Sequence, residues 1–231
     1  MKLIKVSKLF DIYLSKENEK DNPKIIDKDN KKFFRFMDQF YIPDPVYKLS
    51  TPYVKELNTL REKYLSTIDK EYNNYIINNS IDYLLKSNLK IQNILDFGCG
   101  NGYAGSLIKN SFKDISLYGY DIRKPIKKKF LNHYSEVKFK DINSSLPYPD
   151  NFFDVILSFF VFQFFIPDNQ LEELKRLIKP NGILYFNLIK SADFTILKRI
   201  EDIGFTILNK EELVTINNTG CGYAYKLKII K

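Results

Sequence analysis

The sequence has few of the residues that cross-link secreted proteins or bind metal ions. Its 231 residues include no tryptophan, two cysteines and one histidine. Cys99 and Cys221 cannot build a disulfide framework or, with a single histidine, a zinc site of the usual kind. We therefore expect no metal ion and a reducing, cytoplasmic environment. Apolar runs such as Phe159–Phe162 are far shorter than the roughly 18 residues that cross a bilayer, and the segment after Met1 lacks the apolar region of a secretory signal.

Arginine is also scarce. The 36 basic residues include only five arginines, and the formal net charge is +8. Residues 1–90 carry 17 basic and 13 acidic side chains and residues 91–231 carry 19 and 15, so each part has a net charge of +4. Because arginine is best suited to phosphate and base recognition, this even surplus of lysine favours a solvated surface. Only the basic run Arg123–Lys129 leaves a nucleic-acid partner open, although the start of a solvated helix is the favoured interpretation.

The chain is long enough, and at 44% apolar residues hydrophobic enough, for one domain with a sizeable core and an appendage. Residues 16–32 are dominated by polar residues, which predicts an exposed loop. An aromatic cluster follows in residues 33–41, and Ser50-Thr51-Pro52 predicts the start of a helix. We expect residues 1–70 to form an N-terminal extension and helical cap, and residues 71–231 to form the main domain.

From residue 91 onward, short apolar segments alternate with helical patterns. This alternation predicts an α/β fold with a doubly wound, seven-stranded and mostly parallel sheet. The expected strands are residues 91–97, 116–120, 137–140, 154–159, 183–188, 205–208 and 223–230, and the expected helices are 103–110, 169–178 and 194–203.

A glycine-rich turn follows the first of these strands, at Gly98-Cys99-Gly100-Asn101-Gly102. In doubly wound sheets such a turn lies at the carboxyl edge, where ligands bind. Residues 100–105 match the G-x-G-x-x-G pattern of dinucleotide sites, but counted from the strand end the third glycine comes one residue too early. Asp96 would also repel a pyrophosphate and attract a cationic group. The turn therefore favours a nucleoside that carries positive charge.

The segment Asp96–Gly102 resembles the first motif of class I S-adenosyl-L-methionine-dependent methyltransferases. Further motifs of that family recur in order, with Tyr118–Asp121 at the end of the second strand, Leu146–Asp154 before the fourth and Leu177–Leu184 before the fifth. The resemblance covers about residues 70–231. It implies a Rossmann-like fold, S-adenosyl-L-methionine as cofactor and S-adenosyl-L-homocysteine as product.

The resemblance also implies roles for particular residues. Asp121 would bind the two ribose hydroxyls, Ile122 would pack on the adenine, and Asp141 would accept a hydrogen bond from the adenine amino group. The alternatives are a helix cap for Asp96 and ordinary loop acids for the other two aspartates, and Cys99 also fits a packing role. The expected cofactor-binding residues are Asp96, Gly98, Cys99, Gly100, Asp121, Ile122, Asp141, Ile142 and Ser158.

The methyl acceptor and any catalytic base are not identified by the sequence. His133 lies far in sequence from the expected acceptor wall at residues 158–165, where Gln163 is the only strongly polar side chain. The Asn-Pro-Pro-Tyr motif of amino-group nucleic-acid methyltransferases is absent. A tyrosine-rich segment, residues 33–85, predicts either a lid over the acceptor or a plain helical layer on the sheet. Gln163, Tyr53 and Tyr64 are the candidate acceptor contacts.

The sequence thus predicts a methyltransferase for a small-molecule acceptor, such as a metabolite, sugar or lipid. An RNA or protein methyltransferase is one alternative, based on the basic run. A non-catalytic module that binds S-adenosyl-L-methionine is the other.

Overall fold

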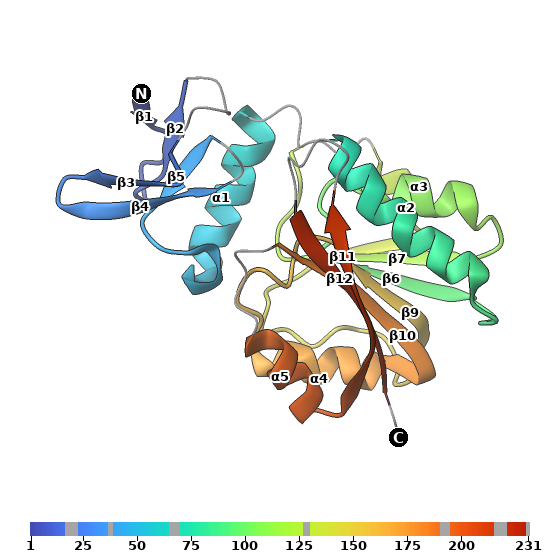
Figure 1. Ribbon diagram of the computed structural model, residues 1–231. Coiled ribbons are helices and arrows are strands. Elements are labelled where there is room, and N and C mark those ends of the chain that lie inside the picture. Colours follow the sequence, from blue (N-terminus) through green and yellow to red (C-terminus); the bar gives the residue numbers. More distant parts are fainter. Residues whose placement is uncertain are drawn as a thin grey trace. The chain divides into compact units, whose positions relative to one another are not determined.

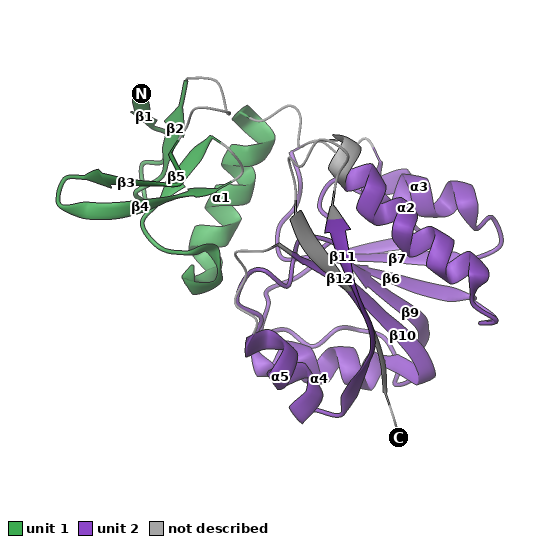
Figure 2. Ribbon diagram, viewed as in Figure 1, with its two compact units in different colours: residues 1–68 green, residues 69–231 purple. Residues whose placement is uncertain are grey.

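The computed structural model describes residues 1–16, 23–36, 39–64, 70–126, 130–189, 195–214 and 221–229 (Figure 1). The chain forms two compact units, residues 1–68 and residues 69–231 (Figure 2). Within the described residues, none of the helices combines the length and hydropathy that a membrane crossing requires.

Unit 1 contains a five-stranded antiparallel sheet with the strand order β1-β2-β5-β4-β3. Its elements are β1 (Leu3–Lys5), β2 (Tyr13–Ser15), β3 (Ile25–Lys28), β4 (Lys31–Phe36), β5 (Phe40–Ile42), the short 3-10 helix η2 (Val46–Lys48) and α1 (Thr51–Tyr64). Asp29 and Asn30 connect β3 to β4 with φ angles of 53° and 60°, values that a tight hairpin turn requires. Tyr13, Phe33 and Tyr41 form a buried cluster in this unit.

The prediction of a helical cap for residues 1–70 is wrong in its secondary structure. The only α-helix among the described residues of unit 1 is α1, which starts where the sequence predicts it; the rest is mainly strand. The polar segment 16–32, predicted as a loop, contains β3, and residues 17–22 lie outside the described residues. The reason is that the aromatic side chains of β4 and β5 bury against a pleated sheet, which aromatic residues favour.

Unit 2 is a doubly wound α/β domain with the strand order β11-β12-β10-β9-β6-β7-β8. The strands from β10 to β8 are parallel to one another, while β12 and β11 run antiparallel at the other edge. The bounds are α2 (Lys70–Lys86), β6 (Asn93–Phe97), α3 (Tyr103–Ser111), β7 (Ser116–Asp121), η3 (Leu131–His133), β8 (Glu136–Phe139), β9 (Phe153–Ser158), α4 (Asp168–Leu177), β10 (Ile178–Ile189), α5 (Thr195–Asp202), β11 (Phe205–Val214) and β12 (Cys221–Ile229). The predicted α/β class is confirmed, and the parallel part comprises five strands.

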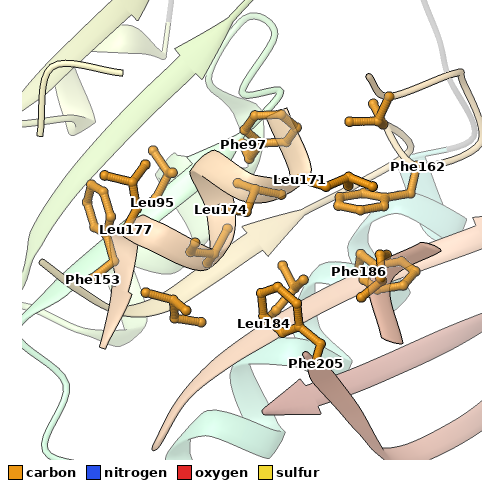
Figure 3. Close-up of a cluster of buried hydrophobic side chains, with 14 of the residues drawn as sticks. Leu95, Phe97, Phe153, Phe162, Leu171, Leu174, Leu177, Leu184, Phe186 and Phe205 are labelled. Carbon is orange, nitrogen blue, oxygen red and sulfur yellow. The ribbon is translucent and has the colours of Figure 1, made fainter. Parts of the chain in front are cut away.

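Two hydrophobic cores cover the two faces of this sheet. One packs residues of α2 and α3 against the strands, and the other packs α4 and α5 (Figures 1 and 3). Helix α4 buries Leu171, Leu174 and Leu177, which recur at helical spacing and therefore form one apolar stripe. Figure 3 shows these side chains directed toward Phe97, Phe153 and other residues of the sheet.

A row of aromatic rings crosses the sheet near its carboxyl edge. Tyr120 of β7 stacks on Phe97 of β6 with ring centroids 5.1 Å apart, and Phe97 lies 6.3 Å from Phe162. Phe162 stacks on Phe186 of β10 at 4.4 Å, and Phe186 stacks on Tyr225 of β12 at 5.4 Å. Large buried rings in contact resist displacement. This row of rings therefore forms a rigid layer of packed side chains near the carboxyl edge.

Candidate functional site

The glycine-rich turn after β6 lies at the carboxyl edge of the sheet. Gly98, Gly100 and Gly102 have φ angles of 87°, 52° and 85°, which L-residues with a side chain rarely adopt. The N–H groups of Gly98 and Cys99 both donate to the Tyr120 carbonyl, at 2.7 and 3.0 Å. The turn is therefore bent sharply and held against the neighbouring strand β7.

The three glycines of this turn have different structural roles. A Cβ atom at Gly98 would lie 2.1 Å from the Val161 Cγ2 atom, and one at Gly102 would lie 2.9 Å from the Phe130 carbonyl carbon and oxygen. A Cβ atom at Gly100 would meet no heavy atom within 4 Å. Gly98 and Gly102 are thus required by packing, whereas Gly100 leaves the backbone open to a ligand.

Asp121 links the end of β7 to this turn. Its Oδ2 atom accepts a hydrogen bond from the Gly100 N–H at 2.9 Å, and its Oδ1 atom accepts one from the Arg123 N–H at 3.0 Å. Burial raises the pKa of Asp121, and these backbone hydrogen bonds oppose the rise. Each carboxylate oxygen has a further lone pair, so Asp121 can brace the turn and still accept from a ligand.

Asp96 is buried on the face of the sheet that α3 covers. The Tyr134 hydroxyl donates to its Oδ2 atom at 2.5 Å and accepts from the Gly105 N–H at 3.1 Å. Helix α3 has Gly102 as its N-cap with no side-chain cap bond, so Asp96 does not cap this helix directly. Desolvation raises the pKa of Asp96 to about 7; the Tyr134 hydrogen bond opposes this rise and the Asp121 charge adds to it.

We expect Asp96 to make the stability of unit 2 depend on pH. A pKa raised in the folded state means that the native protein binds a proton more tightly, so stability falls as the pH rises from about 4 to about 7. The Asp96→Asn variant lacks this titration and should unfold at a temperature a few degrees higher than wild type at about pH 8. Thermal unfolding of both proteins at about pH 5 and about pH 8 measures the effect; equal pH dependence in the two would contradict it.

Sequence reasoning missed Tyr134, which holds Asp96 in place. A Cβ atom at Gly105 would lie 2.3 Å from the Tyr134 ring, and one at Gly119 would lie 3.0 Å from it. The two glycines make room for the ring, but they stand far from it in the sequence. Only the fold brings these residues together, so no local motif could have identified Tyr134.

The other predicted cofactor residues differ in their surroundings. Ile142 and Cys99 are buried, and Ile122 packs at the edge of the core. The exposed Asp141 accepts a hydrogen bond from the Asn143 N–H at 3.1 Å, as in a local turn. Ser158 is fully buried, and its hydroxyl donates to the Phe97 carbonyl at 2.9 Å, which ties β9 to β6. Their contacts with a cofactor stay predictions.

The candidate acceptor residues do not gather at one place in unit 2. Tyr53 and Tyr64 lie on α1 of unit 1, where Tyr53 is buried and donates to the Asp11 carbonyl at 2.8 Å. Tyr64 is 40% exposed. Gln163 is buried in the loop after β9, and its Oε1 atom has no hydrogen-bond partner. His133 lies in η3. Of the basic run, residues 127–129 lie outside the described residues.

A second missed residue is Asn187, near the end of β10. Its side chain is fully buried, and its Oδ1 atom accepts from the Phe160 N–H at 2.8 Å. Phe160 has a φ angle of 61°, which this hydrogen bond helps to hold. Sequence reasoning treated Asn187 as part of an apolar strand, although a single amide in such a strand was an available signal.

Comparison with known proteins agrees with this geometry. Residues 95–186 match a family described as a methyltransferase domain. A search of the curated proteins gives no match.

Solved structures share the fold at low sequence identity. A methyltransferase in complex with the Trm112 activator from Haloferax volcanii is 14% identical, with 76% of this chain and 96% of that chain covered and a TM-score of 0.58. An Aquifex aeolicus SAM-dependent methyltransferase is 19% identical, with coverage of 79% and 100% and a TM-score of 0.51. The Burkholderia thailandensis 1,6-didemethyltoxoflavin-N1-methyltransferase, solved with bound 1,6-didemethyltoxoflavin and S-adenosylhomocysteine, is 10% identical, with coverage of 90% and 100% and a TM-score of 0.58.

These matches confirm the resemblance found in the motifs and the Rossmann-like methyltransferase fold. The Aquifex aeolicus protein is described as SAM-dependent, and the Burkholderia thailandensis structure contains S-adenosylhomocysteine. Residues 95–186, which lie in unit 2, are therefore similar to a methyltransferase domain, and the chain shares the Rossmann-like fold of these solved methyltransferases.

Proposed function

We propose that this protein transfers a methyl group from S-adenosyl-L-methionine to a small-molecule acceptor. The observation that carries the proposal is the turn at Gly98–Gly102, which is open at Gly100 and flanked by the buried carboxyl group of Asp96 and the partly exposed one of Asp121. Asp121 gives this edge of the sheet negative charge, and Asp96, whose pKa is about 7, adds negative charge as the pH rises through that value. A ligand with a positively charged sulfonium and amino group is attracted there, whereas a diphosphate is repelled.

The residues present fit this cofactor. The carboxylate of Asp121 retains lone pairs for the two ribose hydroxyls, and Gly100 allows the backbone to approach the ligand. Ile122 and Ile142 supply apolar surface for the adenine, and Asp141 an acceptor for its amino group. When bound, S-adenosyl-L-methionine supplies an electrophilic methyl group. The chain contributes by holding the reactants in line, and it needs a base only for an acceptor that must lose a proton.

The wall next to the turn favours a small acceptor. Residues 158–166 and 183–189 contain no ionised side chain that a phosphate backbone would need. The Burkholderia enzyme, with 1,6-didemethyltoxoflavin bound, is a precedent for a small ring as the acceptor on this fold. The lysine surplus is divided evenly between residues 1–90 and 91–231, and the run Arg123–Lys129 is the feature that supports the RNA alternative.

The proposal is tested in two steps. We expect calorimetry to detect binding of S-adenosyl-L-methionine and S-adenosyl-L-homocysteine but not of NAD; binding of NAD alone would contradict the cofactor assignment. Incubation of the protein with methyl-labelled cofactor and cell extract should then place the label in the low-molecular-weight fraction. Label in RNA or protein would overturn the acceptor class, and cofactor binding without label in any fraction would indicate a non-catalytic module.

A further inference from the structure

Buried side-chain amides with unpartnered atoms occur near the carboxyl edge of the unit 2 sheet. Among the described residues, these include the Asn187 Nδ2 atom, the Gln163 Oε1 atom and the Asn73 Oδ1 atom. The three side chains are 0%, 2% and 8% exposed. Folded proteins seldom leave such atoms unpaired, and those that do often hold a ligand or a water there.

The orientation of the Asn187 amide is set by the protein. Because its Oδ1 atom accepts from the Phe160 N–H, the Nδ2 atom must be the group that is left free to donate. Gln163 follows Phe160 by three residues in the loop after β9, and its free atom is an acceptor. Strand β10 thus offers one donor, the Asn187 Nδ2 atom, and the loop after β9 offers one acceptor, the Gln163 Oε1 atom.

The register of α2 against β10 places Asn73 on the same side as Asn187. The Tyr185 hydroxyl donates to Asn79 Oδ1 at 2.8 Å, which fixes where helix and strand meet. Asn187 shares the face of Tyr185 and lies about 7 Å further toward the carboxyl edge. Helix α2 leads into the start of β6, so its first turns lie toward the same edge, and Asn73 is about 9 Å from Asn79 in that direction.

We propose that Asn187 and Gln163 bind the methyl acceptor, and that this acceptor presents an uncharged N–H and C=O pair, as a lactam or heterocyclic amide does. The inference rests on the proposed function. The donor and the acceptor atom complement such a pair, and the ring-rich wall of residues 158–165 suits a flat ring. A charged acceptor would find no counter-ion in residues 158–166 or 183–189.

The test uses the full protein saturated with S-adenosyl-L-homocysteine, whose binding is first measured by calorimetry. The probe is 2-pyridone, a neutral lactam, and the charged controls of similar size are benzoate and benzylamine. We expect millimolar 2-pyridone, but neither control, to shift the side-chain amide NMR signals of Asn187 and Gln163. Gln163→Met and Asn187→Asp, which keeps the acceptor for the Phe160 N–H, should each weaken this binding about tenfold.

Gln170→Met is the matched control, because Gln170 is also a buried amide with an unpartnered Oε1 atom but donates to the Ser144 carbonyl from α4. Its loss should leave 2-pyridone binding unchanged. If the protein binds S-adenosyl-L-homocysteine, then unshifted amide signals, or equal binding of 2-pyridone and the charged probes, would overturn the inference. Failure to bind S-adenosyl-L-homocysteine would instead contradict the proposed function.

Discussion

Replacement of Asp121 by alanine is expected to weaken the binding of S-adenosyl-L-homocysteine by about 100-fold. Two hydrogen bonds from ribose hydroxyls to a carboxylate contribute about 1.5 kcal/mol each, and about 3 kcal/mol corresponds to roughly two orders of magnitude in affinity. The variant also loses the two acceptors that hold the Gly100 and Arg123 N–H groups, so the turn itself is less ordered. Titration calorimetry of wild type and variant measures the change.

Asp141→Ala is the comparison variant for this experiment. Asp141 is exposed, and its carboxylate accepts within a local turn from Asn143 rather than bracing the glycine-rich turn. Its loss removes one hydrogen bond to the adenine, so we expect an effect of about tenfold. Unchanged affinity in Asp121→Ala would refute the assignment of Asp121 to the ribose.

The features of the site that the sequence predicts are those encoded in contiguous residues. Asp96 lies in the last two residues of β6, the glycine-rich turn follows that strand, and Asp121 is the last residue of β7. Parallel strands bring their carboxyl ends to one edge of the sheet, so these groups lie at the same edge. The alternation of apolar segments with helical patterns in residues 91–231 located each strand in the described part of unit 2, although β10 and β11 are longer than predicted. The N-terminal unit could not be predicted in this way, since its short strands pair through contacts such as Phe34 with Ile42 that depend on the completed sheet.

The residues that hold the site together could not be predicted from the sequence. Tyr134 contacts Asp96 across 38 positions, and Asn187 contacts Phe160 across 27. Neither lies in a motif, and both tyrosine and asparagine are common in this chain. Their roles depend on which side chain faces which layer of the fold. The sequence therefore predicts where the groups at strand ends lie, but not the side chains that position them.

Gly98→Ala should be among the most destabilising substitutions at the turn, lowering the free energy of unfolding by about 3 kcal/mol. An alanine at a φ angle of 87° costs about 1–2 kcal/mol, and moving Val161 away from a Cβ atom 2.1 Å from its Cγ2 atom adds a further 1–3 kcal/mol. Gly100→Ala also has a positive φ angle but meets no atom within 4 Å, so we expect a loss of only about 1 kcal/mol. Denaturant unfolding of both variants measures the difference.

The two substitutions should separate folding from ligand binding. An alanine at Gly100 occupies the open side of the turn, so it should weaken S-adenosyl-L-homocysteine strongly while the protein stays folded. The double variant Gly98→Ala/Val161→Ala should lose less free energy of unfolding than the sum of the losses in the two single variants, by more than about 1 kcal/mol. The reason is that the smaller side chain at position 161 removes the overlap but leaves the backbone strain at position 98. Additive effects of Gly98→Ala and Val161→Ala would show that the overlap is relieved by movement of other residues. Equal stabilities of the Gly98→Ala and Gly100→Ala variants would contradict the different roles assigned to the two glycines.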